Sequence, residues 1–111
     1  MFFYTSVIPA KAGIQVNLNH MNIKSLYKII QDRKLKMPKD SYVASLFRLG
    51  EDRIIQKIGE EATEVVIAAK NKNKKRIISE VSDLWFHILI ILASFNIAPD
   101  EIVKELNNRS K

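Results

Sequence analysis

The sequence contains no cysteine, and it has only three glycines and three prolines in 111 residues. The lack of cysteine excludes disulfide scaffolds, thiolate zinc sites, iron–sulfur clusters and cysteine nucleophiles. The scarcity of glycine and proline excludes collagen-like and low-complexity chains, and it disfavours a turn-rich all-β fold. No uninterrupted apolar run reaches the roughly 20 residues that span a bilayer. The longest run, residues 84–93, is interrupted by His87, and its length is typical of a buried core helix.

The composition is that of an ordinary soluble globular chain, with 47% hydrophobic and 27% charged residues. A length of 111 residues corresponds to one domain at most. The 18 basic and 12 acidic residues give a net charge of +6. Such a charge suits nucleic acid, an anionic membrane surface or a phosphorylated small molecule, and by itself does not choose among them.

Residues 1–20 differ in pattern from the rest of the chain. Pro9 and Gly13 interrupt them, and no apolar periodicity persists. They have no basic region before the apolar start and no clear cleavage site, so we do not interpret them as a signal peptide. We expect a disordered or spurious N-terminal extension, with Met21 as the natural start and residues 21–111 as the domain. The alternative is a short strand or coil docked on that domain.

Apolar residues at three- and four-residue spacing predict helices over residues 23–36, 51–70, about 74–96 and 99–107. Asn22 is the expected N-cap of the first helix, and Pro99 the first residue of the last. Residues 38–49 are interpreted as a loop leading to a short turn, and 71–75 as a polar basic connector. Gly59, inside the second helix, predicts close approach of a backbone or ligand. The predicted fold class is all-α: a single-domain bundle of about four helices.

Two predicted helices each carry a pair of acids toward the core. At roughly 100° per residue, Glu61 falls inside the apolar stripe of its helix and Glu64 lies at the edge. On the next long helix, Glu80 and Asp83 form a stripe with His87, between apolar residues. Burying four ionised carboxylates together requires a counter-charge. An all-oxygen ligand set favours Mg²⁺, or Mn²⁺ in its place, over zinc.

A purely structural interpretation of these acids also exists. Acid-rich helices are commonly solvated faces with i,i+4 salt bridges to lysine. The second acid pair, beside an apolar helix half, favours a metal site instead. His87 is interpreted as a core histidine beside the ligands rather than among them. Most of the basic run at residues 70–76 is interpreted as solvated charge, whereas Lys57 shares the face of the acids and is predicted to hold phosphate.

The segments SYVASL, KIGEEATEVVIAAKN and SEVSDLWFHIL, within residues 41–94, closely resemble phosphoribosyl-ATP pyrophosphatases, and the resemblance spans about residues 23–109. The pattern E-E-x-x-E followed by E-x-x-D marks the wider MazG-like superfamily of all-α nucleotide pyrophosphatases. The resemblance implies a cytoplasmic hydrolase that forms a homodimer. It implies Mg²⁺-dependent hydrolysis of phosphoribosyl-ATP to phosphoribosyl-AMP and pyrophosphate, the second step of histidine biosynthesis.

The resemblance also implies roles for individual residues. The metal ligands carried over by motif are Glu61, Glu64, Glu80 and Asp83. Glu60 is implied as an outer ligand or a residue that positions water, and Lys57 as a catalytic residue that contacts phosphate. The implied substrate-binding residues are Ser41, Tyr42, Ser45, Lys57, Lys70 and Asn71.

Two other functions remain alternatives. A house-cleaning pyrophosphatase for non-canonical dNTPs would share the acids, but the SYVASL segment argues against it. A basic helical nucleic-acid-binding module would use the basic run. The sequence shows no helix-turn-helix pattern, and no aromatic residue lies between the clustered bases.

The third predicted helix is apolar on nearly every side in its second half. A monomer of about 90 structured residues has difficulty covering such a helix. We therefore expect at least a dimer. The residues expected at or near its interface are Trp85, Phe86, Leu89 or Ile90.

Overall fold

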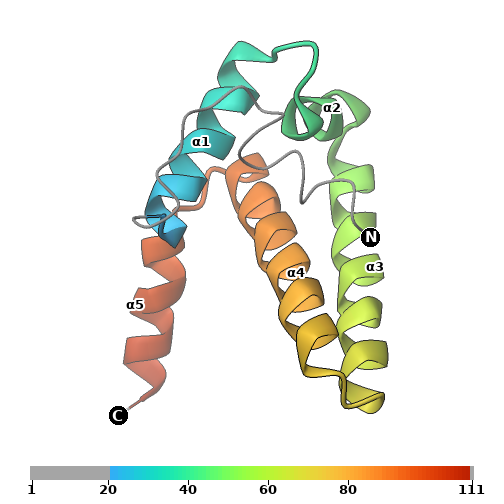
Figure 1. Ribbon diagram of the computed structural model, residues 1–111. Coiled ribbons are helices and arrows are strands. Elements are labelled where there is room, and N and C mark those ends of the chain that lie inside the picture. The colour runs from blue at the N-terminus through green and yellow to red at the C-terminus, as the bar shows by residue number, and fades with distance from the viewer. Residues whose placement is uncertain (1–20, 111) are drawn as a thin grey trace.

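Five helices follow one another along residues 21–110, the part of the chain that the computed structural model describes (Figure 1). They are α1 (Ile23–Lys36), α2 (Tyr42–Leu49), α3 (Glu51–Lys70), α4 (Lys74–Ser94) and α5 (Pro99–Arg109). The two long helices, α3 and α4, form an antiparallel hairpin and share the most extensive contact of the fold. Helices α1 and α2 pack at the end of the hairpin opposite its turn, and α5 runs from there beside α4, leaning away from it. The all-α class is confirmed; the expected extension at residues 1–20 lies outside the described residues.

Local side-chain caps explain where most helices begin. The Asn22 side chain accepts a hydrogen bond from the Ser25 N–H at 2.8 Å, as expected for the N-cap of α1. Asn73 does the same for α4 by accepting from the Arg76 N–H at 3.1 Å. Pro99 is the first residue of α5, as predicted, because its fixed φ suits a position that needs no N–H.

The interpretation of residues 38–49 as a loop and turn was wrong. Residues Tyr42–Leu49 form helix α2, which Ser41 caps by accepting from the Ala44 N–H at 3.1 Å. Helix α2 buries Val43 and Leu46 in the core. Eight residues make about two helical turns, too few for the periodicity of a helix to stand out from a short apolar run. The helix ends at Gly50, whose φ of 102° is one that glycine adopts without strain.

The core lies where α4 meets α1, α2 and the start of α3. Its buried members are Tyr27, Ile30, Val43, Leu46, Ile54, Phe86, Leu89, Ile90 and Ala93. Four of these belong to the second half of α4, so one side of this half is buried as predicted, while Trp85 and Ile88 on it stay exposed. Among the described helices, α4 alone is long and apolar enough to cross a membrane. The core helix of a soluble protein meets the same criteria of length and composition.

Gly59 does not show the close backbone approach predicted for it. A Cβ atom placed there would meet no heavy atom of the described residues within 4 Å. Gly59 lies on the exposed side of α3, where it costs about 1 kcal/mol of helix stability relative to alanine.

Truncating the centre of the core should destabilise the protein. Ile90 is fully buried, so Ile90→Ala removes three methyl or methylene groups and leaves a cavity. We expect it to lower the free energy of unfolding by about 2–4 kcal/mol in urea denaturation followed by circular dichroism. Leu35→Ala is the control, because Leu35 is 84% exposed. Equal losses for the two variants would contradict the position of the core.

Candidate metal centre

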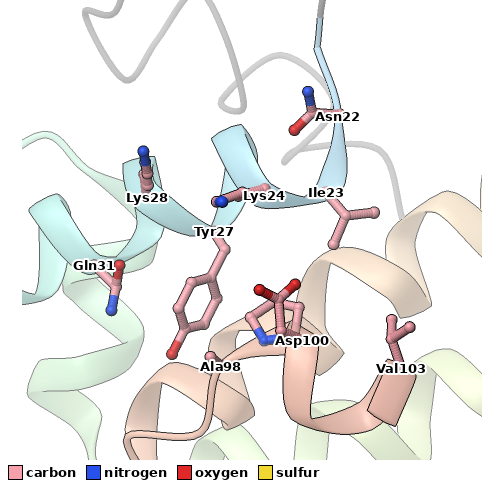
Figure 2. Close-up of a pocket in the computed structure, with 10 residues that line it drawn as sticks. Asn22, Ile23, Lys24, Tyr27, Lys28, Gln31, Ala98, Asp100 and Val103 are labelled. Carbon is pink, nitrogen blue, oxygen red and sulfur yellow. The ribbon is translucent and has the colours of Figure 1, made fainter. Parts of the chain in front are cut away.

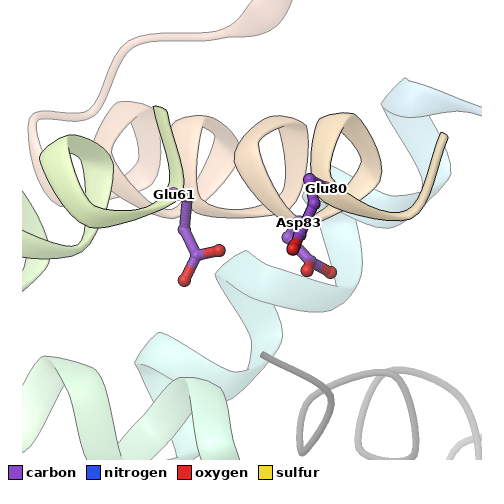
Figure 3. Close-up of side chains that lie close together, drawn as sticks. All are labelled: Glu61, Glu80 and Asp83. Carbon is purple, nitrogen blue, oxygen red and sulfur yellow. The ribbon is translucent and has the colours of Figure 1, made fainter. Parts of the chain in front are cut away.

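Packing of α3 against α4 brings three carboxylates together. One oxygen from each of Glu61, Glu80 and Asp83 lies within 4.8 Å of the others. Figure 3 shows Glu61 on α3 and Glu80 and Asp83 on α4 projecting to the same side of the helix pair. The three side chains, called the acid cluster below, are buried, with exposed fractions of 0%, 3% and 1%. Glu80 and Asp83 converge because residues three apart lie on one helix face.

The acid cluster has unsatisfied oxygen atoms. Glu80 Oε1 and Asp83 Oδ2 are buried and have no hydrogen-bond partner among residues 21–110. Buried polar atoms are normally paired, and an unpaired buried charge is more costly still. Burial raises the pKa of Asp83 to about 7, because the surroundings disfavour its charged form. These atoms fit a hard divalent cation, which takes carboxylate oxygens as ligands at about 2.0–2.6 Å.

A buried lysine compensates part of the negative charge. Lys57 is 1% exposed, and its Nζ lies 3.1 Å from Glu61 Oε1 and 3.5 Å from Glu60 Oε1. Arg53 reaches the other oxygen of Glu60 at 3.2 Å. Desolvation acts to raise the pKa of Glu60, but the hydrogen bond from Arg53 and the charges of Arg53 and Lys57 outweigh it and lower that pKa. Glu60 therefore stays ionised beside the cluster.

Glu64 stands apart from the three converging acids. Its carboxylate is 35% exposed, and Glu64 Oε2 lies 4.0 Å from Arg76 Nη2. This position agrees with the edge of the apolar stripe, where the sequence placed it. The role of Glu64 as a fourth ligand stays a prediction.

A chain of two hydrogen bonds ties α2 to the turn of α4 that carries Asp83. His87 Nδ1 lies 2.7 Å from the Asp83 carbonyl oxygen, which only accepts, so Nδ1 carries the proton. The remaining nitrogen, Nε2, accepts from the Tyr42 hydroxyl at 2.9 Å. Burial lowers the pKa of His87 and raises that of Tyr42, which keeps the histidine neutral and the phenol protonated. His87 is thus a satisfied core histidine beside the cluster, as the sequence indicated.

Four further residues named from the sequence are not part of the acid cluster. Ser41 caps α2, and Ser45 Oγ donates to the Tyr42 carbonyl at 2.5 Å, so both hydroxyls have local partners. Lys70 and Asn71 are exposed at the end of α3. Lys70 is nine residues from Glu61, about 13 Å along the helix axis.

Arg76 is a charged neighbour of the cluster that the sequence analysis missed. Its Nη2 lies 3.1 Å from Glu80 Oε2. The i,i+4 spacing of Arg76 and Glu80 was the available signal, but it was hidden within the basic run.

One cavity of the described residues is not lined by the acids of the cluster. It has a volume of about 630 Å³ and lies between α1 and the start of α5, where Tyr27 points toward Ala98 (Figure 2). The Tyr27 hydroxyl donates to the Ile97 carbonyl at 2.7 Å and so joins the two segments. Among residues 21–110, Asp100 is its single acidic lining residue, so these residues offer no metal-binding chemistry comparable to that of the acid cluster. The candidate site is therefore the acid cluster.

The raised pKa of Asp83 predicts a pH dependence of stability. An acid whose pKa is raised on folding binds more protons in the folded state, so stability falls as pH rises between the two pKa values. For metal-free protein, we expect the free energy of unfolding to fall from pH 3.8 toward about 7 because of Asp83. Asp83→Asn should remove this contribution. Urea denaturation in chelator at several pH values measures it.

Asp52→Asn is the matched control, because Asp52 is exposed in the first turn of α3. The control should follow the pH curve of the wild type. If the free energy of unfolding changed with pH in the same way for Asp83→Asn and the wild type, the conclusion that Asp83 is buried with a raised pKa would be contradicted.

Comparison with known proteins identifies the family. A family model described as phosphoribosyl-ATP pyrophosphohydrolase matches residues 23–110. A phosphoribosyl-ATP pyrophosphatase of Pelotomaculum thermopropionicum is 48% identical over 87 residues, which cover 78% of this chain and 89% of the relative. The protein of that name from Geobacter sulfurreducens is 46% identical over a stretch that covers 78% of this chain and 81% of the relative. The one from Clostridium botulinum is 45% identical over 85% of this chain and 84% of the relative. The chain therefore belongs to the phosphoribosyl-ATP pyrophosphohydrolase family.

Proposed function

We propose that the protein hydrolyses phosphoribosyl-ATP to phosphoribosyl-AMP and pyrophosphate in the cytoplasm, as the second step of histidine biosynthesis. Family membership over residues 23–110 supports the substrate and the reaction. The observation that carries the chemistry is the convergence of three buried carboxylates between α3 and α4. Carboxylate sites for Mg²⁺ commonly hold the phosphates of a substrate.

Mg²⁺ is the proposed cofactor, with Mn²⁺ as a substitute. Glu61, Glu80 and Asp83 would hold it, and Glu64 at the outer edge would complete the ligand set. When bound, such an ion polarises phosphoryl oxygens and lowers the pKa of a bound water.

The residues around the cluster would position the reactants. Water adds at the α-phosphorus, and the bond from that phosphorus to the departing pyrophosphate breaks. Lys57 holds Glu61 in place and supplies positive charge close to the leaving group. Glu60, ionised and 42% exposed on its side chain, is suited to orient the attacking water. We assign further substrate contacts to Ser41, Tyr42, Ser45, Lys70 and Asn71.

The substrate assignment predicts a selective activity. Pyrophosphate should be released from phosphoribosyl-ATP in the presence of Mg²⁺, and release should stop with excess chelator. The controls are dATP and dUTP, which should release little. Release from the deoxynucleotides instead would keep the metal centre and move the protein to the house-cleaning group of pyrophosphatases.

The ligand assignment predicts that replacing a ligand greatly lowers enzymatic activity and leaves the protein folded. Asp83→Asn and Glu64→Gln keep side-chain shape but remove a negative ligand, so we expect the rate of pyrophosphate release to fall by about three decades. Asp52→Asn, on the exposed surface of α3, should keep normal activity. Circular dichroism checks that each variant is folded. Normal turnover by folded Asp83→Asn protein would rule out Asp83 as a ligand.

We also propose that the protein is a homodimer, joined through α4 and α5. None of the eleven residues of α5 is buried against the described part of the chain. An isolated helix of this length is marginal in water. Between α4 and α5 lies an apolar groove of about 400 Å³ whose lining includes Trp85, Ile88, Ile102 and Leu106. A second copy, bringing the same groove, would cover these side chains.

The interface proposed here differs in part from the one expected from sequence. Phe86 and Ile90 are buried in the core of the single chain and do not line the groove, Leu89 is buried and lines it, and Trp85 lines it and is 56% exposed. Trp85 is therefore the residue of that group best placed to contact a partner.

The dimer proposal predicts the mass of the protein in solution and a substitution that dissociates the dimer. Light scattering at micromolar concentration should give twice the chain mass of 12.8 kDa. Ile102→Glu places a charge in the groove and should shift the protein toward the monomer. Leu35→Glu is the control, since Leu35 is highly exposed and does not line the groove. A well-folded wild-type monomer would contradict the proposal.

A further inference from the structure

Arg76 lies at the outer edge of the acid cluster, between the acids of α3 and those of α4. Its Nη2 is 3.1 Å from Glu80 Oε2 and 4.0 Å from Glu64 Oε2. The Arg76 side chain is 55% exposed, whereas that of Glu80 is only 4% exposed. Arg76 therefore reaches from solvent to a buried carboxylate and covers one of its two oxygens.

The two cations beside the cluster differ in their freedom to move. Lys57 is enclosed, with 1% exposure, and holds Glu61 from within the protein. Arg76 is half-exposed on a long side chain, so its guanidinium can leave Glu80 and remain solvated. Meanwhile the second oxygen of Glu80, Oε1, and Asp83 Oδ2 stay without a hydrogen-bond partner among the described residues. Arg76 thus balances only part of the charge that a divalent ion would balance.

We propose that Arg76 is a resident counter-cation of the metal centre. Without metal, it pairs with Glu80 and Glu64 and limits the repulsion within the acid cluster. Arg76 would compete with a divalent ion held by these carboxylates, because two positive charges close together repel each other. Displaced from Glu80, the guanidinium is available to the phosphate oxygens of the substrate, which its planar array of donors suits. The inference rests on the proposed function for the metal and the phosphates.

A plain surface ion pair would behave differently. Exposed i,i+4 pairs on helices contribute little and have no connection to a metal. Replacing Arg76 would then leave metal affinity unchanged. If Arg76 is a counter-cation, removal of its positive charge raises the affinity of the site for metal. General damage to the site does not raise that affinity.

Titration of metal into the chelator-treated full chain tests whether Arg76 competes with a divalent ion for the carboxylates. Mn²⁺ binding is measured by calorimetry for the wild type, Arg76→Gln, Arg76→Lys and Lys75→Gln. We expect Arg76→Gln to bind Mn²⁺ about three- to tenfold more tightly, and Arg76→Lys, which keeps the charge, to stay close to the wild type. Lys75→Gln removes the same charge from the next, exposed residue and should shift the affinity by less than about twofold.

Titration of pyrophosphate at saturating Mg²⁺ tests the second half of the inference. Arg76→Gln should bind pyrophosphate about three- to tenfold more weakly than the wild type, since a charge-assisted contact is lost. Lys75→Gln should again differ little. Tighter Mn²⁺ binding with unchanged pyrophosphate binding would keep the counter-cation and overturn the phosphate contact.

Failure of this inference is distinguishable from failure of the metal centre. Equal or weaker Mn²⁺ binding by folded Arg76→Gln protein, with clear binding by the wild type, would overturn the counter-cation alone. Absence of Mn²⁺ binding by the wild type would overturn the metal centre and the inference with it.

Discussion

Three carboxylates buried at the contact between α3 and α4 are the constraint on which the rest of this structure depends. Like charges in a dry interior repel one another and lose their hydration, so they need positive charge close by. The protein supplies Lys57 from within and Arg76 from the solvent side. Oxygens of Glu80 and Asp83 still lack partners among the described residues, which supports a divalent ion as the remaining counter-charge.

The surrounding fold holds these acids in place. The long hairpin sets Glu61 opposite Glu80 and Asp83, and α1 and α2 pack against it at the end away from its turn (Figure 1). The hydrogen-bond chain from Tyr42 through His87 to the Asp83 carbonyl couples α2 to the turn of α4 that carries Asp83. In metal sites, hydrogen bonds of this kind orient the ligands. The exposed apolar residues of α4 and α5 line the groove at which we propose that a second copy binds.

Periodicity in the sequence predicted the long helices well, because each carries several turns of apolar residues. The bounds of α1 and α3 agree with the prediction, whereas α2 was missed because it is only two turns long. A helical wheel placed Glu61, Glu80 and Asp83 toward the core, and the structure brings them together. A wheel gives an angle on one helix but no distance across a helix pair, so the separation of Glu64 from the cluster and the reach of Arg76 to Glu80 were not predictable. The groove beside α5 depends on the angle between α4 and α5, which the local sequence pattern of neither helix encodes.

Diffraction from crystals soaked with Mn²⁺ tests the central claim most directly, because the anomalous signal locates the ion without reference to activity. The account predicts a peak bounded by Glu61, Glu80 and Asp83, about 2.0–2.3 Å from their carboxylate oxygens. It also predicts that the peak is absent from Asp83→Asn crystals soaked in the same way. A fully ordered wild-type site with no peak at these three carboxylates would contradict the account.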